Sequence, residues 1–120
     1  MARNGSSVTW LDGHCVQLYR LRGKDASPEG HRLTPHADAL TFYEDGHCTV
    51  VVRDHCFRYR RRLLELLVHE AIHCAEYLYH IEDIEQPADC SRAATGLSHI
   101  ICQFLENLPR EWKRAAGLLG

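Results

Sequence analysis

The chain has 120 residues, of which 45% are hydrophobic and 25% are charged, and its formal net charge is −2 at pH 7. This length suits one domain rather than two. The nearly neutral charge gives no reason to expect binding to nucleic acid or to an anionic membrane surface. No apolar stretch approaches the ~18 residues that a transmembrane helix needs, and residues 1–7 lack the apolar segment of a signal peptide. We therefore expect one soluble, cytoplasmic domain that spans residues 1–120.

Cysteine and histidine are unusually frequent, with six cysteines and nine histidines in the chain. No two cysteines form a C-x-x-C pair. In a cytoplasmic protein, free buried thiols are the expected state, and a disulfide framework is the alternative. The histidines favour a metal site without locating it. The cysteines are Cys15, Cys48, Cys56, Cys74, Cys90 and Cys102.

The part of the chain between residues 8 and 53 has the pattern of short strands and turns. Asp12-Gly13 and Asp45-Gly46 are dipeptides typical of tight β-hairpin turns, and each is flanked by β-prone runs. Residues 22–36 have little periodicity and are expected to form a loop. Four strands are therefore predicted, at Val8–Leu11, Cys15–Leu21, Ala39–Tyr43 and Thr49–Val52.

A histidine-cysteine pair follows each hairpin turn, as His14-Cys15 and His47-Cys48. These four side chains are all zinc ligands by type. However, neighbouring residues of a strand point to opposite faces of the sheet. One metal would therefore not reach both members of a pair, and we expect ordinary strand residues here.

The second half of the chain has helical periodicity. Apolar residues recur at helical spacing over about residues 57–80, and the basic run Arg58–Arg62 is interpreted as the solvated start of this helix. Pro87 suits the first position of a second helix over about residues 87–108. Residues 110–119 have room for one or two further turns. The predicted class is α+β, with a small antiparallel-rich sheet of two hairpins packed on two helices.

The first predicted helix contains the sequence His69-Glu70-Ala71-Ile72-His73. Because His69 and His73 are four residues apart, both imidazoles lie on one face of the helix, one turn apart. Such a pair provides two nitrogen ligands for a tetrahedral Zn²⁺. Glu70 would then be the general base that takes a proton from a zinc-activated water. The three polar residues interrupt an apolar helix, where polar groups without a role would cost stability.

A structural interpretation of this HExxH pattern stays open, because only three of its positions are defined. In that case the two histidines would be hydrogen-bonded at the edge of the core, and Glu70 would be solvated. Cys74 is expected to point towards the core, away from the metal. Tyr77, one turn after His73, would either pack or donate a hydrogen bond to a ligand.

A catalytic zinc site needs a third protein ligand, and the second predicted helix is the place to find it. Asp89 continues the apolar stripe of that helix, so its carboxylate is expected to point inward, and binding a cation would explain that position. The alternative is that Asp89 only interacts with the positive end of the helix dipole. Glu85 and Glu82 are the next candidates, followed by His80 on the first helix.

The segment from Leu66 to Cys74 resembles the "LLHE-hydrophobic-hydrophobic-HA" motif of small gluzincin-like metallopeptidases of the phage and prophage type. In that family an acidic linker follows, and then a helix with an acidic residue before "LA-x-GL", to which Asp89 and Ala93–Leu97 are similar. The resemblance covers residues 8–108 and implies a minimal zincin fold, bound zinc and peptide hydrolysis. The family's usual third ligand is glutamate, so the shorter Asp89 would need the two helices to lie closer together.

The leading hypothesis is therefore a zinc-dependent metallopeptidase whose peptide or protein substrate lies along the edge strand of the sheet. One alternative is a non-catalytic zinc-binding module with a structural or protein-interaction role. Another is a regulatory protease with one specific protein partner. Replacing Glu70 by Gln separates the first two, because only an enzyme would lose hydrolysis while keeping its zinc.

Overall fold

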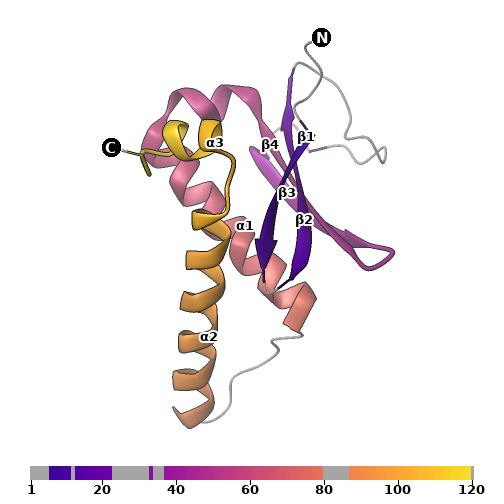
Figure 1. Ribbon diagram of the computed structural model, residues 1–120, viewed down its shortest axis with the longest axis vertical. Coiled ribbons are helices and arrows are strands. Elements are labelled where there is room, and N and C mark those ends of the chain that lie inside the picture. The colour runs from indigo at the N-terminus through magenta and orange to yellow at the C-terminus, as the bar shows by residue number, and fades with distance from the viewer. Residues whose placement is uncertain (1–5, 12, 23–32, 34–36, 80–86, 120) are drawn as a thin grey trace.

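The computed structural model describes residues 6–11, 13–22, 33, 37–79 and 87–119, with the backbone alone described at Ser6, Tyr79 and residues 87–96. Within these residues the chain forms a four-stranded sheet, one 3-10 helix and three α-helices, which is an α+β architecture (Figure 1). The strands are β1 (Ser6–Leu11), β2 (His14–Leu21), β3 (Ala39–Glu44) and β4 (His47–Arg53). The helices are η1 (Asp54–Arg58), α1 (Arg60–Tyr79), α2 (Pro87–Glu106) and α3 (Arg110–Ala115).

The sheet has the strand order β1-β2-β4-β3. Both predicted hairpins are present, because β1 pairs with β2 and β3 pairs with β4 in antiparallel fashion. The two hairpins are joined by parallel pairing of β2 with β4, in which Val16 lies opposite Cys48. The sheet is therefore mixed, and β1 and β3 are the edge strands of its described part.

The turn between β3 and β4 follows from its two residues. Asp45 has φ 51° and Gly46 has φ 77°, so both lie in the left-handed region. Two consecutive left-handed residues define a type I′ turn, whose twist matches that of the strands it joins. Aspartate and glycine are among the residues that tolerate these angles, which is why this dipeptide predicts the hairpin.

The helix that carries the HExxH sequence starts three residues later than the periodicity indicates. Asp54–Arg58 forms the separate helix η1, and Tyr59 has an extended backbone with φ −122° and ψ 92°, which interrupts the helix between η1 and α1. α1 then contacts β3 and β4, while α2 contacts β1 and lies beside α1 (Figure 1). Both long helices thus cover the same face of the sheet.

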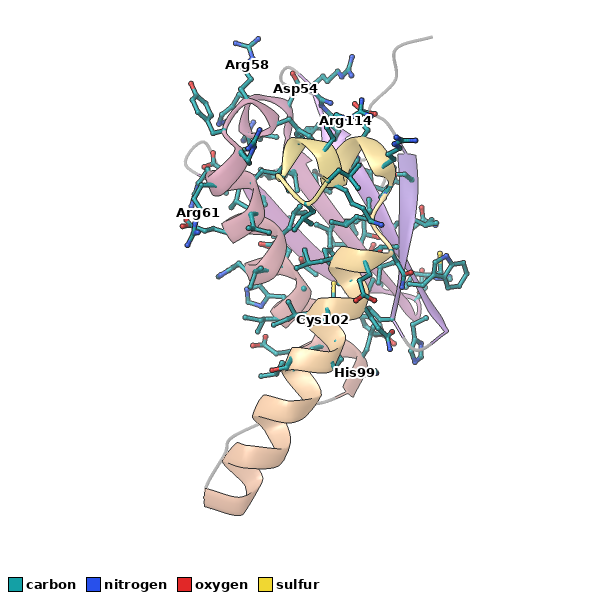
Figure 2. The ribbon with its side chains drawn as sticks, turned by 60° about the vertical axis from the view of Figure 1, so that its left-hand side comes forward. Asp54, Arg58, Arg61, His99, Cys102 and Arg114 are labelled. Atoms are coloured by element: carbon teal, nitrogen blue, oxygen red, sulfur yellow. The ribbon has the colours of Figure 1, made fainter. Side chains whose placement is uncertain are left out.

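The main core lies between this face and the helices. The predicted stripe of α2 is confirmed where its side chains are described, since Ile100, Phe104 and Leu108 are buried. The opposite side of α2 carries the exposed side chains of His99 and Cys102 (Figure 2). The expectation of buried thiols is confirmed for Cys48, Cys56 and Cys74, whereas Cys15 is only partly buried and Cys102 is exposed. Strand residues that face the helices are Thr9, Leu11, Val16, Leu18, Thr41, Cys48, Val50 and Val52.

The described helices do not meet the requirements of a membrane span. None of them combines the length and the apolar character that crossing a bilayer requires.

Candidate metal centre

A hollow of about 280 Å³ lies between α1 and the edge strand β3. It forms there because α1 packs against β3, and the HExxH residues lie on the part of α1 that faces this strand. All three polar residues of the HExxH sequence contribute to its wall. The lining residues are Ala39, Leu40 and Thr41 of β3 and His69, Glu70, His73 and Tyr77 of α1.

The two imidazoles face each other through their Nε2 atoms, which are 3.1 Å apart. Their ring centroids are 4.7 Å apart and the ring planes are inclined by 78°. A tetrahedral zinc ion with bonds of about 2.0–2.1 Å to each nitrogen requires a nitrogen–nitrogen separation of about 3.3–3.4 Å. The separation between His69 and His73 is within a few tenths of an ångström of that value. The donor pair therefore fits zinc without a rearrangement of the helix.

Glu76 orients the second histidine. Its Oε2 lies 3.0 Å from Nδ1 of His73. An Nδ1–H that donates to a carboxylate leaves the lone pair of the ring on Nε2, which is the atom that faces His69. A carboxylate behind a histidine in this way is the usual second partner of a metal-binding imidazole. His73 is thus held in the tautomer and orientation that a metal ligand needs.

Glu70 is buried, with 3% of its surface exposed. The hydroxyl of Thr41 on β3 donates a hydrogen bond to Oε2 of Glu70, with 2.5 Å between the two oxygens. This contact satisfies one oxygen of a carboxylate that has left bulk water, which would otherwise be costly. Glu70 is therefore not solvated, contrary to the structural interpretation of the motif, and its carboxylate is fixed beside the histidine pair.

Other residues near the motif have structural surroundings. Cys74 is fully buried, as expected, and its Sγ lies 3.2 Å from Sγ of Cys48. The ring of Tyr77 stacks on that of Tyr43 with a centroid distance of 5.9 Å. His47 is exposed while Cys48 points into the core. The two neighbours therefore diverge, in line with the expectation that the hairpin histidines and cysteines do not share one metal.

The candidates for a third ligand have no described side chains. The backbone of Asp89 is in the first turn of α2, but its side chain is not described. His80, Glu82 and Glu85 fall entirely outside the described ranges. The third ligand, Asp89 or one of these alternatives, thus stays a prediction.

Two residues of the site were missed by the sequence analysis. Glu76 follows His73 by three positions, and this helical spacing would have allowed the contact between them to be predicted from the sequence. Thr41 has a weaker signal. Strand alternation places it on one face of β3, but only the packing of α1 on β3 brings it to Glu70.

Comparison with known proteins adds nothing to this geometry. No protein-family model matches the chain, and neither curated proteins nor solved structures give a match.

Proposed function

We propose that the protein is a zinc-dependent metallopeptidase with a minimal zincin-like fold. His69 and His73 bind the metal, and Glu70 is the general base. The observation that carries this proposal is the approach of the two Nε2 atoms to 3.1 Å in a hollow that Glu70 also lines. Zinc held there would supply a Lewis acid that polarises a carbonyl group and makes water a better nucleophile at neutral pH.

The residues of the chain have separate roles in this reaction. Glu70 accepts a proton on its carboxylate from the attacking water and transfers it to the leaving amine. Thr41 holds that carboxylate from the side of the sheet. Glu76 holds His73 from the side away from the hollow. Asp89 is proposed as the third ligand, with Glu85 and Glu82 as the alternatives.

The substrate is proposed to be an extended peptide that adds to the edge strand β3. Among the described strands β3 pairs only with β4, so its other edge offers backbone groups for pairing. Because Ala39, Leu40 and Thr41 of this strand line the hollow, a peptide paired with β3 would lie next to the histidine pair. Backbone pairing would provide affinity with little dependence on the peptide's sequence.

The size of the hollow favours a second candidate function, a zinc-binding module without turnover. Its volume of about 280 Å³ is just below the range of about 300–1,000 Å³ that is usual for ligand pockets. Such a module would keep the metal as a structural or protein-binding element. We prefer the peptidase because a structural zinc site gives no role to the buried carboxylate of Glu70.

The Glu70→Gln variant tests the choice between the two functions. Glutamine keeps the size of the side chain and its carbonyl accepts the Thr41 hydrogen bond, but it cannot accept a proton. We expect one zinc per histidine pair to remain and cleavage of an unstructured protein such as casein to fall by about 10²–10⁴-fold. Glu65→Gln, on an exposed position of α1, is the matched control and keeps full activity.

A second measurement separates metal binding from turnover. Zinc content is measured in His69→Ala and Asp89→Ala variants, and both are expected to lose the metal. If wild-type protein binds zinc but neither wild type nor Glu70→Gln cleaves any peptide, the peptidase is rejected in favour of the binding module. The proposal includes a cytoplasmic location, where Cys48 and Cys74 would remain thiols.

A further inference from the structure

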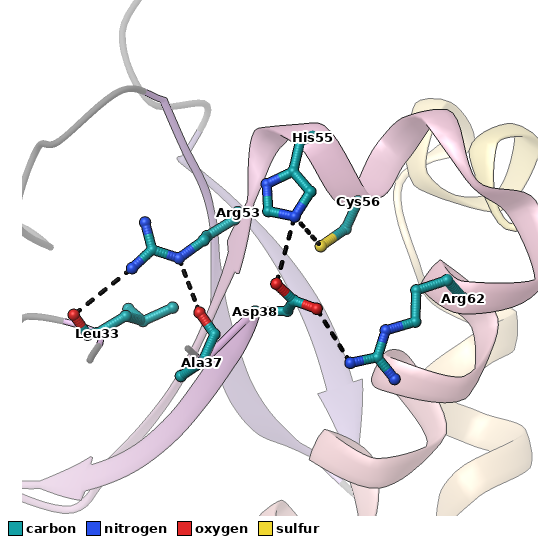
Figure 3. A network of polar contacts seen from close by, with 7 residues as sticks. All are labelled: Leu33, Ala37, Asp38, Arg53, His55, Cys56 and Arg62. Atoms are coloured by element: carbon teal, nitrogen blue, oxygen red, sulfur yellow. Dashed lines mark hydrogen bonds and ion pairs between the residues drawn. The ribbon is translucent and has the colours of Figure 1, made fainter. Parts of the chain in front are cut away.

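A second cluster of metal-ligand side chains lies where η1 meets the start of β3. Asp38 directly precedes β3, and His55 and Cys56 are neighbours on η1 (Figure 3). One ligand atom from each residue lies within 4.8 Å of the other two. This is the one such group of three among the residues that the structure describes. It is separate from the histidine pair, because it shares no residue with the hollow between α1 and β3.

Two of the distances within the cluster match the edges of a coordination tetrahedron. Nε2 of His55 is 3.2 Å from Oδ1 of Asp38 and 3.6 Å from Sγ of Cys56. Zinc bonds of about 2.0–2.2 Å to nitrogen and oxygen and about 2.3 Å to sulfur give edges of about 3.4 Å (N to O) and about 3.6 Å (N to S). The two observed separations therefore suit a single ion placed between the three atoms.

Hydrogen bonding alone accounts for this arrangement less well. A single ring nitrogen, Nε2 of His55, faces both the carboxylate and the thiol. If Nε2 carries a hydrogen, it donates to Asp38, and the thiol of Cys56 is then at most a weak second acceptor. If Nε2 is bare, it can accept from the thiol but faces the carboxylate lone pairs. A cation at the common centre satisfies all three atoms at once.

Asp38 is held in place independently of any metal (Figure 3). Its backbone carbonyl accepts the N–H of Arg53 at 2.9 Å. The Arg53 side chain donates through Nε to the carbonyl of Ala37 at 2.7 Å. Nη2 of Arg62 donates to Oδ2 of Asp38 at 3.0 Å, so that the other oxygen, Oδ1, is directed to His55. A hydrogen bond to the second oxygen of a carboxylate is a common support of metal ligands.

The charges around the cluster allow a divalent cation. An aspartate carboxyl group is charged at neutral pH, and Arg62 donates a hydrogen bond to its Oδ2, so Asp38 contributes one negative charge. An ion that binds a cysteine takes it as the thiolate, which adds a second negative charge. Together with the ion, Asp38, Cys56 and Arg62 then sum to about +1, or about +2 when the nearby Arg53 is included, in a cluster that is open to solvent. The side chain of His55 is 58% exposed, so solvent reaches the cluster.

We propose that Asp38, His55 and Cys56 form a second metal site, for zinc or another divalent transition-metal ion that accepts oxygen, nitrogen and sulfur ligands together. Water would take the remaining position. The metal would act as a clip, because it joins the start of the edge strand β3 to the short helix that leads into α1. The inference is independent of the proposed peptidase function.

Cobalt(II) provides the test, because a thiolate ligand gives cobalt a charge-transfer absorption in the near ultraviolet that histidine and carboxylate ligands do not give. The titration uses the full chain with the His69→Ala and His73→Ala substitutions, which remove the first candidate centre. We expect one cobalt ion per chain and a thiolate band. Cys56→Ser is expected to abolish the band, and His55→Ala to weaken cobalt binding at least tenfold. Zinc is expected to displace the cobalt and to raise the thermal midpoint.

Cys102→Ser is the matched control, because this cysteine is exposed on α2 and lies outside the cluster; its variant should keep the band (Figure 2). His55→Ala covers the case in which Cys56→Ser does not fold, since His55 is mostly exposed and its truncation leaves the core intact. The proposal is overturned if the parent chain shows no thiolate band, or if a band of full strength persists in folded His55→Ala protein.

Discussion

At the scale of single residues, a hydroxyl group on the sheet supports the Glu70 carboxylate. Glu70 is almost fully buried, and its Oε2 accepts a hydrogen bond from the hydroxyl of Thr41 on β3. A buried acceptor that loses its partner costs about 1–3 kcal/mol, because its lost hydration is no longer replaced. Thr41 therefore contributes both to stability and to the position of the proposed general base.

Thr41→Val tests this double role. Valine keeps the shape of threonine but removes the hydroxyl, so the free energy of unfolding should fall by about 1–3 kcal/mol. Turnover should fall by about 10–100-fold with zinc retained, as when a residue that orients a functional group is lost. Urea denaturation and peptide cleavage measure the two effects. The matched control is Thr9→Val, since Thr9 is also buried and its hydroxyl donates to the Phe104 carbonyl, away from the site. Equal activity in the two variants would contradict the role of Thr41.

Glu76 gives a prediction about metal affinity alone. Glu76→Gln weakens the partner of His73 Nδ1, so the imidazole is less well oriented and less basic. We expect zinc to bind about 10–100-fold more weakly, with little change in stability, because Glu76 is exposed. Competition with a coloured chelator measures this affinity. An unchanged dissociation constant would show that Glu76 does not support His73 as a metal ligand.

At the scale of elements, the first turn of α1 carries positive charge, which the helix dipole disfavours at that end. Its first three residues are Arg60, Arg61 and Arg62, although the amino end of a helix favours negative charge. Two of these arginines have acidic partners. Arg61 pairs with Glu65 one turn later, and Arg62 pairs with Asp38 before β3. The second pair links the start of the helix to the sheet, so the basic run is more than a solvated helix entry.

η1 is held by aromatic and charged contacts from α3 and β2. Phe57 of η1 meets the ring of Trp112 of α3 edge-to-face, with 4.9 Å between centroids. The guanidinium of Arg20 lies 4.2 Å from the centroid of the Phe57 ring on another side and also pairs with Asp54 and Glu111. α3 is only six residues long, so its stability comes from this packing rather than from helix propensity.

Trp112→Ala should therefore destabilise the whole protein. Removing a buried tryptophan usually costs about 3–5 kcal/mol, as contacts are lost and a cavity is left. Urea denaturation measures the loss, and Trp112→Leu should show a smaller one if the alanine variant does not fold. Trp10→Ala is the matched control, because Trp10 is 47% exposed on β1, and it should change stability by about 0.5 kcal/mol or less. A Trp112 variant as stable as the control would show that α3 does not pack on η1.

The elements differ in how far the sequence predicts them. Asp45-Gly46 predicts its hairpin because few residue pairs accept two left-handed conformations. The spacing of His69 and His73 predicts their shared face from helix geometry alone. Local pattern says nothing of the parallel pairing of β2 with β4, which is a contact between segments far apart in the chain. The same limit applies to Asp38 and Cys56, whose proximity depends on how β3 and η1 pack together.

At the scale of the whole molecule, the sheet has a large core on one face and a small cluster on the other. The face towards the helices carries the main core, and the far face buries Leu21, Phe42 and Val51. Cys48 of β4 and Cys74 of α1 meet in the middle of the main core, with their sulfurs 3.2 Å apart. The chemical reactivity of these two thiols therefore shows whether the helices stay packed on the sheet.

Thiol alkylation gives a prediction for the fold as a whole. The thiolate is the reactive form of cysteine. Burial raises the pKa of Cys56 to about 11, and the hydrogen bond with Cys48, followed by burial, raises the pKa of Cys74. In metal-free native protein at about pH 8, near the ordinary pKa of a thiol, iodoacetamide should therefore modify Cys102 first and leave Cys56 and Cys74 unmodified.

The protein is labelled with and without denaturant, and mass spectrometry of its peptides gives the modified fraction of each cysteine. This measurement distinguishes unfolding of the whole domain from local opening of one element. If the sheet and helices form one cooperative unit, Cys74 becomes reactive only when the whole domain unfolds. Its protection from alkylation should then decline with urea in parallel with the far-ultraviolet circular dichroism signal. Cys102, on the exposed side of α2, should react at the same rate at all urea concentrations. If Cys74 instead reacts at low urea while the circular dichroism is unchanged, α1 opens from the sheet on its own. The candidate metal centre would then lie on a locally unstable element, because His73 directly precedes Cys74 in α1.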